Sequence, residues 1–163
     1  MSGRPADADD AGAAAGLSTT GDRGPAADRG PTAHRIQLDP DPTAAANYSP
    51  GFRIGDLVVV SGQAALDAHS RTVGAGDFDA QAAQVFANLR RVLRGAGSDL
   101  EQVVKVTTYL NNMAHFRKIS ALRAQQLTAP YPADTIVEFR VLTRPELTLE
   151  IEAIALVGGT LAA

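Results

Sequence analysis

Cysteine is absent from this 163-residue chain, and so is tryptophan. Without a thiol, the protein forms no disulfide, has no thiolate nucleophile and offers no Cys-ligated zinc site. Its chemistry must therefore use oxygen and nitrogen groups. A cysteine-free chain is also at home in a reducing compartment, so we expect a cytoplasmic protein.

The chain has little excess charge and no long apolar run. Its formal net charge is -3, so it lacks the basic surplus that binds a phosphate backbone, and we predict no nucleic-acid partner. The longest strongly apolar run, residues 57–60, is far below the roughly 20 residues of a membrane-spanning helix. Residues 1–17 lack the uninterrupted apolar core of a secretory signal. We therefore expect neither membrane association nor export.

Signatures of cofactor and metal binding are missing as well. No G-x-G-x-x-G or P-loop motif is present, so the chain lacks the usual loops that bind a nucleotide phosphate. The three histidines, His34, His69 and His115, have no partner at the spacing of metal ligands. Surface or capping roles are favoured for them, and they support no catalytic triad. We predict a protein without a metal or a cofactor.

What the chain does contain is 45% hydrophobic and 20% charged residues, a composition typical of a globular protein. Residues 1–33 differ from the rest, because they are rich in Ala, Gly, Pro and Asp and have almost no large apolar side chain. Such a segment buries too little to offset the entropy of ordering it. We predict a disordered tail over residues 1–33 and one domain over residues 34–163.

Hydrophobic periodicity predicts the elements of this domain. Apolar residues at three- and four-residue steps over residues 82–93 predict a helix that Asp77 or Asp79 caps and Gly95 ends. Alternating or β-branched segments predict strands. These strands are expected at residues 36–38, 52–54, 57–62, 103–110, 135–141 and 147–157.

A second helix is expected to begin at Asn112 and to end before Pro130, with Phe116, Ile119 and Leu127 on its apolar side. A mixed sheet with both helices packed on one face would bury the two apolar stripes. The other face of that sheet would then need a partner, and several of its positions are apolar. Oligomerisation follows as a hypothesis.

The last strand carries the clearest candidate for chemistry. Glu150 and Glu152 are two residues apart, so both carboxylates lie on one face of the strand. A carboxylate in a partly dry cleft can have a raised pKa and can then move protons or orient water. A solvent-facing strand with alternating charges is the alternative, and the spacing alone favours it.

Several blocks, in order, resemble the Rid family, also called YjgF/YER057c/UK114. The resemblance covers roughly residues 46–157. The blocks are Asn47-Tyr48-Ser49, the segment 55–63 ending in Ser61-Gly62-Gln63, Asn88-Leu89, Ala96-Gly97-Ser98, the segment 103–110, and the segment 149–155 with its Glu-Ile-Glu-Ala.

This resemblance implies a chorismate-mutase-like α/β (α+β) fold and a homotrimer whose sheets face a central core, with small-molecule clefts at the subunit interfaces. Characterised members hydrolyse enamines and imines, such as 2-aminoacrylate, to ketoacids and ammonia. In those members an arginine in a Pro-Ala-Arg-Ser segment clamps the substrate carboxylate, and the first glutamate of Glu-Ile-Glu-Ala positions water.

Matched to that pattern, Glu150 is the catalytic, water-handling glutamate. Tyr48 is the cleft tyrosine, and Ile136 contributes its backbone. Ser120 stands where the family usually has asparagine. Asp134 stands where the arginine is expected, in Pro132-Ala133-Asp134-Thr135. At about 4 Å this reversal of charge is worth a few kcal/mol, so a substrate carboxylate in the usual pose should be repelled.

Two other arginines are candidates to replace the missing one. Arg140 lies roughly 20 Å along the strand from Asp134, which is too far. Arg144 lies in a predicted loop and can fold back, although nothing in the sequence directs it.

Two functions stay open at this point. One is a Rid-like hydrolase or tautomerase that acts on a cationic or neutral enamine or imine, without standard 2-aminoacrylate deaminase activity. The other is a non-catalytic trimer whose interface cleft binds a metabolite or a partner protein.

Overall fold

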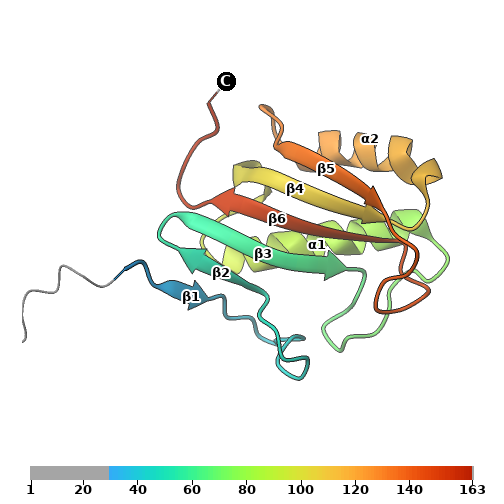
Figure 1. Ribbon diagram of the computed structural model, residues 1–163, viewed down its shortest axis with the longest axis horizontal. Coiled ribbons are helices and arrows are strands. Elements are labelled where there is room, and N and C mark those ends of the chain that lie inside the picture. The colour runs from blue at the N-terminus through green and yellow to red at the C-terminus, as the bar shows by residue number, and fades with distance from the viewer. Residues whose placement is uncertain (1–29, 163) are drawn as a thin grey trace, which may run out of the picture. The chain divides into compact units, whose positions relative to one another are not determined.

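The computed structural model describes residues 30–162, and in it six strands form one mixed sheet (Figure 1). The strand order is β1-β2-β3-β6-β4-β5, and only β4 and β5 pair in parallel. The strands are β1 (Ala33–Arg35), β2 (Gly51–Ile54), β3 (Leu57–Ala64), β4 (Val103–Leu110), β5 (Ala133–Glu138) and β6 (Leu149–Leu156). Residues 1–29 of the predicted tail lie outside the described residues.

Strands β2 and β3 form the predicted hairpin. Gly55 has a φ of 60° at the turn, a conformation that glycine adopts without steric cost. The first strand differs from the prediction, because β1 pairs with β2 over Ala33–Arg35 rather than over residues 36–38. Ile36 follows the paired residues; its N–H donates to the carbonyl of Gly51, and its side chain is buried in the core. Its apolar character therefore reflects burial.

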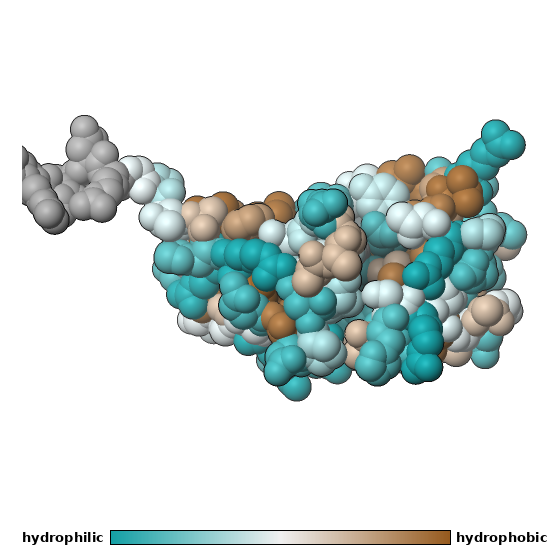
Figure 2. Space-filling model, turned by 90° about the horizontal axis from the view of Figure 1, so that it is seen from below, coloured by the Kyte–Doolittle hydropathy of each residue, from teal (hydrophilic) through white to brown (hydrophobic). Residues whose placement is uncertain are grey.

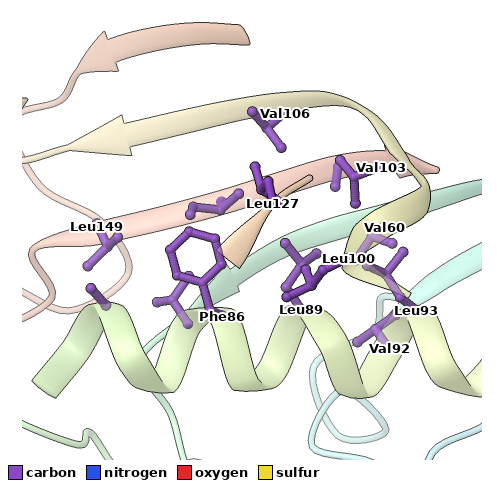
Figure 3. Close-up of a cluster of buried hydrophobic side chains, with 14 of the residues drawn as sticks. Val60, Phe86, Leu89, Val92, Leu93, Leu100, Val103, Val106, Leu127 and Leu149 are labelled. Carbon is purple, nitrogen blue, oxygen red and sulfur yellow. The ribbon is translucent and has the colours of Figure 1, made fainter. Parts of the chain in front are cut away.

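Helix α1 (Phe78–Gly95) packs on one face of the sheet and supplies much of the core. The Asp77 side chain accepts hydrogen bonds from the backbone N–H groups of Asp79 and Ala80, so Asp77 is the cap. The buried side chains Phe86, Leu89 and Leu93 of α1 meet those of the sheet above it (Figure 3). This packing confirms the predicted apolar face of the first helix.

The second helix begins later than expected. A 3₁₀ turn, η2 (Met113–His115), follows Asn112 and leads into α2 (Phe116–Gln126). Ile119 and Leu127 are buried as predicted, but Phe116 is 47% exposed. The His115 ring stacks on Phe78 at a centroid distance of 4.1 Å. Because neighbouring helical residues point about 100° apart, Phe116 is turned away from that contact.

Both helices lie on the same face of the sheet (Figure 1), which confirms the predicted arrangement. On the opposite face, Leu57, Val59 and Val137 remain 38%, 40% and 39% exposed. Figure 2 shows hydrophobic surface gathered along the upper side of that view. In residues 30–162, no helix is long and apolar enough to cross a membrane.

Candidate functional site

Glu150 lies near the start of β6, in a pocket of about 320 Å³ beside β3. The β ladders place it between Ala64 of β3 and Tyr109 of β4. Its neighbour Ile151 is buried under the helices, so the side chain of Glu150 emerges on the other face of the sheet. The pocket walls include Tyr48, Ser61, Gly62, Asn88, Arg91 and Glu150.

Gly62 makes room for the Glu150 carboxylate. A Cβ atom on residue 62 would lie 1.9 Å from Oε1 of Glu150, which is inside van der Waals contact. The register of β3 against β6 shifts between Val60 and Gln63. The Ser61 hydroxyl donates to the carbonyl of Ser49 at 2.6 Å. Together these features bring the Ser-Gly-Gln segment, Glu150 and the loop that carries Tyr48 to one place.

Two effects raise the pKa of Glu150. Burial is the larger, and the carboxylate of Glu152, on the same face of β6, adds to it. Glu150 forms no ion pair in the part of the chain that the structure describes. Burial and then the charge of Glu150 raise the pKa of Tyr48. Glu150 therefore holds a proton more readily than a surface glutamate and can exchange it with a ligand or with water.

Asp134 lies in a different pocket. It pairs in register with Val106, which is buried under the helices, so its side chain emerges on the helix face of β5. There it forms an ion pair with Arg123 of α2. This second pocket encloses about 250 Å³, and its walls include Ser120 and Tyr131.

The candidate residues thus fall into two groups. Tyr48 and Glu150 share one pocket, and Ser120 and Asp134 share the other. The ladders separate Glu150 from Asp134 by two strand spacings and three residues of β4, or about 14 Å between Cα atoms. One protomer does not bring them to the same ligand.

The charge around Asp134 also differs from the expectation. The sequence predicts an acid there that repels a substrate carboxylate, and in the structure Arg123 pairs with this acid. Arg123 follows Ser120 by three residues on α2, so both lie on the same side of the helix. That spacing is the signal from which Arg123 could have been found.

Ile136 and Arg144 take other positions. Ile136 is two residues beyond Asp134 on β5, and its side chain packs against the core. The Arg144 guanidinium donates to the hydroxyl of Thr72 at 3.1 Å, and it pairs with neither Glu150 nor Asp134 in the described chain. Arg144 therefore connects its loop to Thr72 and lies beside neither candidate acid within a protomer.

Arg91 was missed from the sequence. It borders the Glu150 pocket, and its guanidinium donates to the carbonyl of Pro40. It follows Asn88 by three residues on α1, the same spacing that relates Arg123 to Ser120.

No candidate metal site is present in the described residues. Residues 30–162 hold no group of three or more His, Asp or Glu side chains that could bind a metal ion.

Comparison with known proteins decides the family. The family model described as Endoribonuclease L-PSP matches residues 39–157. The chain belongs to the Rid family. A solved Rid structure, RidA from the Antarctic bacterium Psychrobacter sp. PAMC 21119, superposes with a TM-score of 0.70 at 32% identity, covering 76% of this chain and 99% of that one.

Two curated relatives add detail. A RutC family protein of Pyrococcus horikoshii is 34% identical over 108 residues, which are 66% of this chain and 85% of that protein. A protein of Dermatophagoides farinae named 2-iminobutanoate/2-iminopropanoate deaminase is 27% identical over 110 residues, which are 68% of this chain and 85% of that protein. Rid membership therefore rests on most of the described domain.

Proposed function

We propose that this Rid protein hydrolyses or tautomerises an enamine- or imine-type small molecule at the Glu150 pocket, without standard 2-aminoacrylate deaminase activity. The observation that carries this proposal is a half-buried carboxylate with a raised pKa, set against Gly62 in a pocket. The Dermatophagoides farinae relative is named for its action on imines, which supports the same class of reacting group.

The geometry suits proton transfer to and from a C=N group. In hydrolysis, the Glu150 carboxylate takes a proton from water as the water oxygen bonds to the iminium carbon. Glu150 then gives this proton to nitrogen and takes the hydroxyl proton as the C–N bond breaks, which releases a carbonyl compound and ammonia. The proton left on Glu150 passes to the ammonia or to water. In tautomerisation, Glu150 removes a proton from the carbon next to C=N, and nitrogen gains one. The cationic iminium lies beside the Glu150 carboxylate, whose negative charge stabilises it.

The substrate is proposed to be cationic or neutral, and to lack a carboxylate at the reacting end. Glu150 has no paired cation among the described residues, and Asp134 occupies Arg123. Of the arginines that border the two pockets, Arg123 is paired with Asp134 and Arg91 donates to the carbonyl of Pro40. A 2-aminoacrylate molecule therefore lacks, at position 134, the arginine clamp that the family resemblance implies.

We propose a cytoplasmic homotrimer with its small-molecule sites between subunits and no nucleic-acid partner. The exposed Leu57, Val59 and Val137 support a partner on the open face of the sheet. A shared cleft for Glu150 and Asp134 would also need two protomers, because one protomer holds them about 14 Å apart. Light scattering should give a mass near three times 16.9 kDa; a monomer at micromolar concentration contradicts the trimer.

The second candidate function is a trimer that binds a metabolite or a partner protein without catalysis. One observation favours it, namely that no cation is paired with Glu150 in the described chain. A single measurement separates the two candidates. The enzyme turns over a substrate in a way that depends on Glu150, whereas the binding protein shows no turnover.

The test uses a stable imine without a carboxylate, 2-methyl-1-pyrroline. In D₂O, its tautomerisation exchanges the protons next to C=N, and ¹H NMR follows their loss. The wild type should speed this exchange above buffer, and Glu150→Gln should reduce the enzymatic rate by about a hundredfold or more. Glu138→Gln, at an exposed position on β5, is the matched control and should keep the wild-type rate.

Two outcomes oppose the proposal. A wild type that leaves the exchange at the buffer rate favours the non-catalytic binder. Pyruvate release from 2-aminoacrylate above the spontaneous rate, lost in Glu150→Ala, shows that the excluded substrate is in fact used.

A further inference from the structure

The pocket under α2 contains an arginine whose guanidinium is already paired with an acid of the same chain. Its charged wall residues are Arg123 and Asp134, and these two form an ion pair. The rest of the wall is largely apolar or aromatic and includes Val106, Leu127 and Tyr131. A pocket of this kind admits a small, partly apolar ligand whose orientation the two charges control.

The guanidinium of Arg123 is poorly hydrated. Its side chain is 17% exposed and that of Asp134 is 28% exposed. Burial lowers the pKa of Arg123, which means that the charged form has lost part of its water shell. Such a cation needs an acceptor, and Asp134 supplies one from the adjacent strand.

We propose that Asp134 is a specificity-determining residue that occupies Arg123 and so prevents this pocket from binding a carboxylate, and that Arg123 binds one once the acid is removed. Asp134 is attached to the same chain, so it is present at a high effective concentration, and a free carboxylate must displace it. This inference goes beyond the proposed function, because it concerns binding and does not require that Glu150 catalyse a reaction.

The neutral substitution Asp134→Asn is the informative one. It keeps the size of the side chain and removes its charge, so the guanidinium fork becomes available to a carboxylate from solution. Arginine at position 134 would be less informative, because two guanidinium groups would then face each other across the pocket.

A purely structural role is the competing explanation. In that case the ion pair only ties α2 to β5. Loss of the tie would lower stability, but it would create no affinity for anions. Binding of a small anion therefore separates the two explanations.

The experiment titrates the full-length chain with propanoate, and with propanamide as its uncharged counterpart, using ¹H–¹⁵N chemical shifts of residues in α2 and β5. We expect Asp134→Asn to bind propanoate at least about tenfold more tightly than the wild type, with no gain for propanamide. The double variant Asp134→Asn/Arg123→Gln should lose the gain. Asp134→Ser, a second neutral variant, should reproduce it.

Three results would overturn the inference. The first is equal propanoate affinity in wild type and Asp134→Asn. The second is a gain that persists without Arg123 or that propanamide shares. The third is unfolding of both neutral variants, which would show that the ion pair is a structural tie. The imine exchange assay tests the catalytic role of Glu150 separately, so that role stands or fails independently of this inference; only the exclusion of carboxylate substrates shares its premise.

Discussion

Gly62 lies directly against the carboxylate of Glu150. A Cβ atom at position 62 would lie 1.9 Å from Oε1 and 2.7 Å from Cδ of that side chain. The glycine of the Ser-Gly-Gln segment is thus explained by the space it leaves for the proposed catalytic group. Here φ is not the constraint, because Gly62 is not among the glycines with positive φ.

Gly62→Ala should displace the Glu150 carboxylate without unfolding the protein. The atoms that would clash belong to a flexible side chain, which can turn away at modest cost. We expect the rate of Glu150-dependent exchange of 2-methyl-1-pyrroline to fall at least about tenfold, because the displaced carboxylate no longer contacts the proton that it removes. The Tm should change by only a few degrees. Adding Gly62→Ala to Glu150→Gln should cause no further loss, and an unchanged rate in Gly62→Ala alone would contradict this account.

The raised pKa of Glu150 predicts how stability depends on pH. The folded protein holds the Glu150 proton more readily than the unfolded chain, whose value is near 4.5. The resulting stabilisation is fully present below that value and is lost as pH rises through the folded pKa. Glu150→Gln should therefore melt higher than the wild type at pH 8, by roughly 1–3 °C, and the difference should shrink towards pH 4. Calorimetry at several pH values checks this, and a variant that melts lower at pH 8 contradicts it.

Gln81 is a buried polar residue that joins α1 to the segment before β6. Its side-chain amide donates to the carbonyls of Gly74 and Glu146, at 3.1 Å and 2.7 Å. Its oxygen accepts from the backbone and hydroxyl of Thr148, at 2.8 Å and 2.9 Å. Gln81→Leu keeps the size but leaves these groups unpaired, so we expect a loss of about 3 kcal/mol or more. Urea unfolding measures it, and Gln125→Leu, at an exposed position, is the matched control.

Asp77 caps α1 with two hydrogen bonds from its side chain. Asp77→Ala should lower the free energy of unfolding by about 1 kcal/mol, whereas Asp77→Asn should keep most of the stability, because an amide oxygen still accepts. Asp79→Ala is the comparison, since Asp79 was the alternative cap in the sequence. Thermal melts of the three variants decide the matter, and an equal loss in Asp77→Ala and Asp79→Ala would argue against this cap.

Elements with a strong local pattern could be predicted closely. The strand over residues 103–110 has the predicted bounds, and the first helix begins after Asp77, one of its two predicted caps. The errors lie where tertiary contacts compete with local pattern. Phe116 fits an apolar stripe, yet it is exposed, and its neighbour His115 makes the stacking contact with Phe78 instead. Ile36 alternates like a strand residue but is buried beyond the paired strand.

The mixed sheet, the two helices on one face and membership in the Rid family could all be predicted from the residue order, because periodicity and ordered motifs are local properties. Which charges meet depends on how the chain folds in three dimensions. The fold places Glu150 and Asp134 on opposite faces and sets Arg123 against Asp134. Ion pairs form between side chains that the sheet and α2 bring together across the fold, and the order of residues along the chain does not encode that distance.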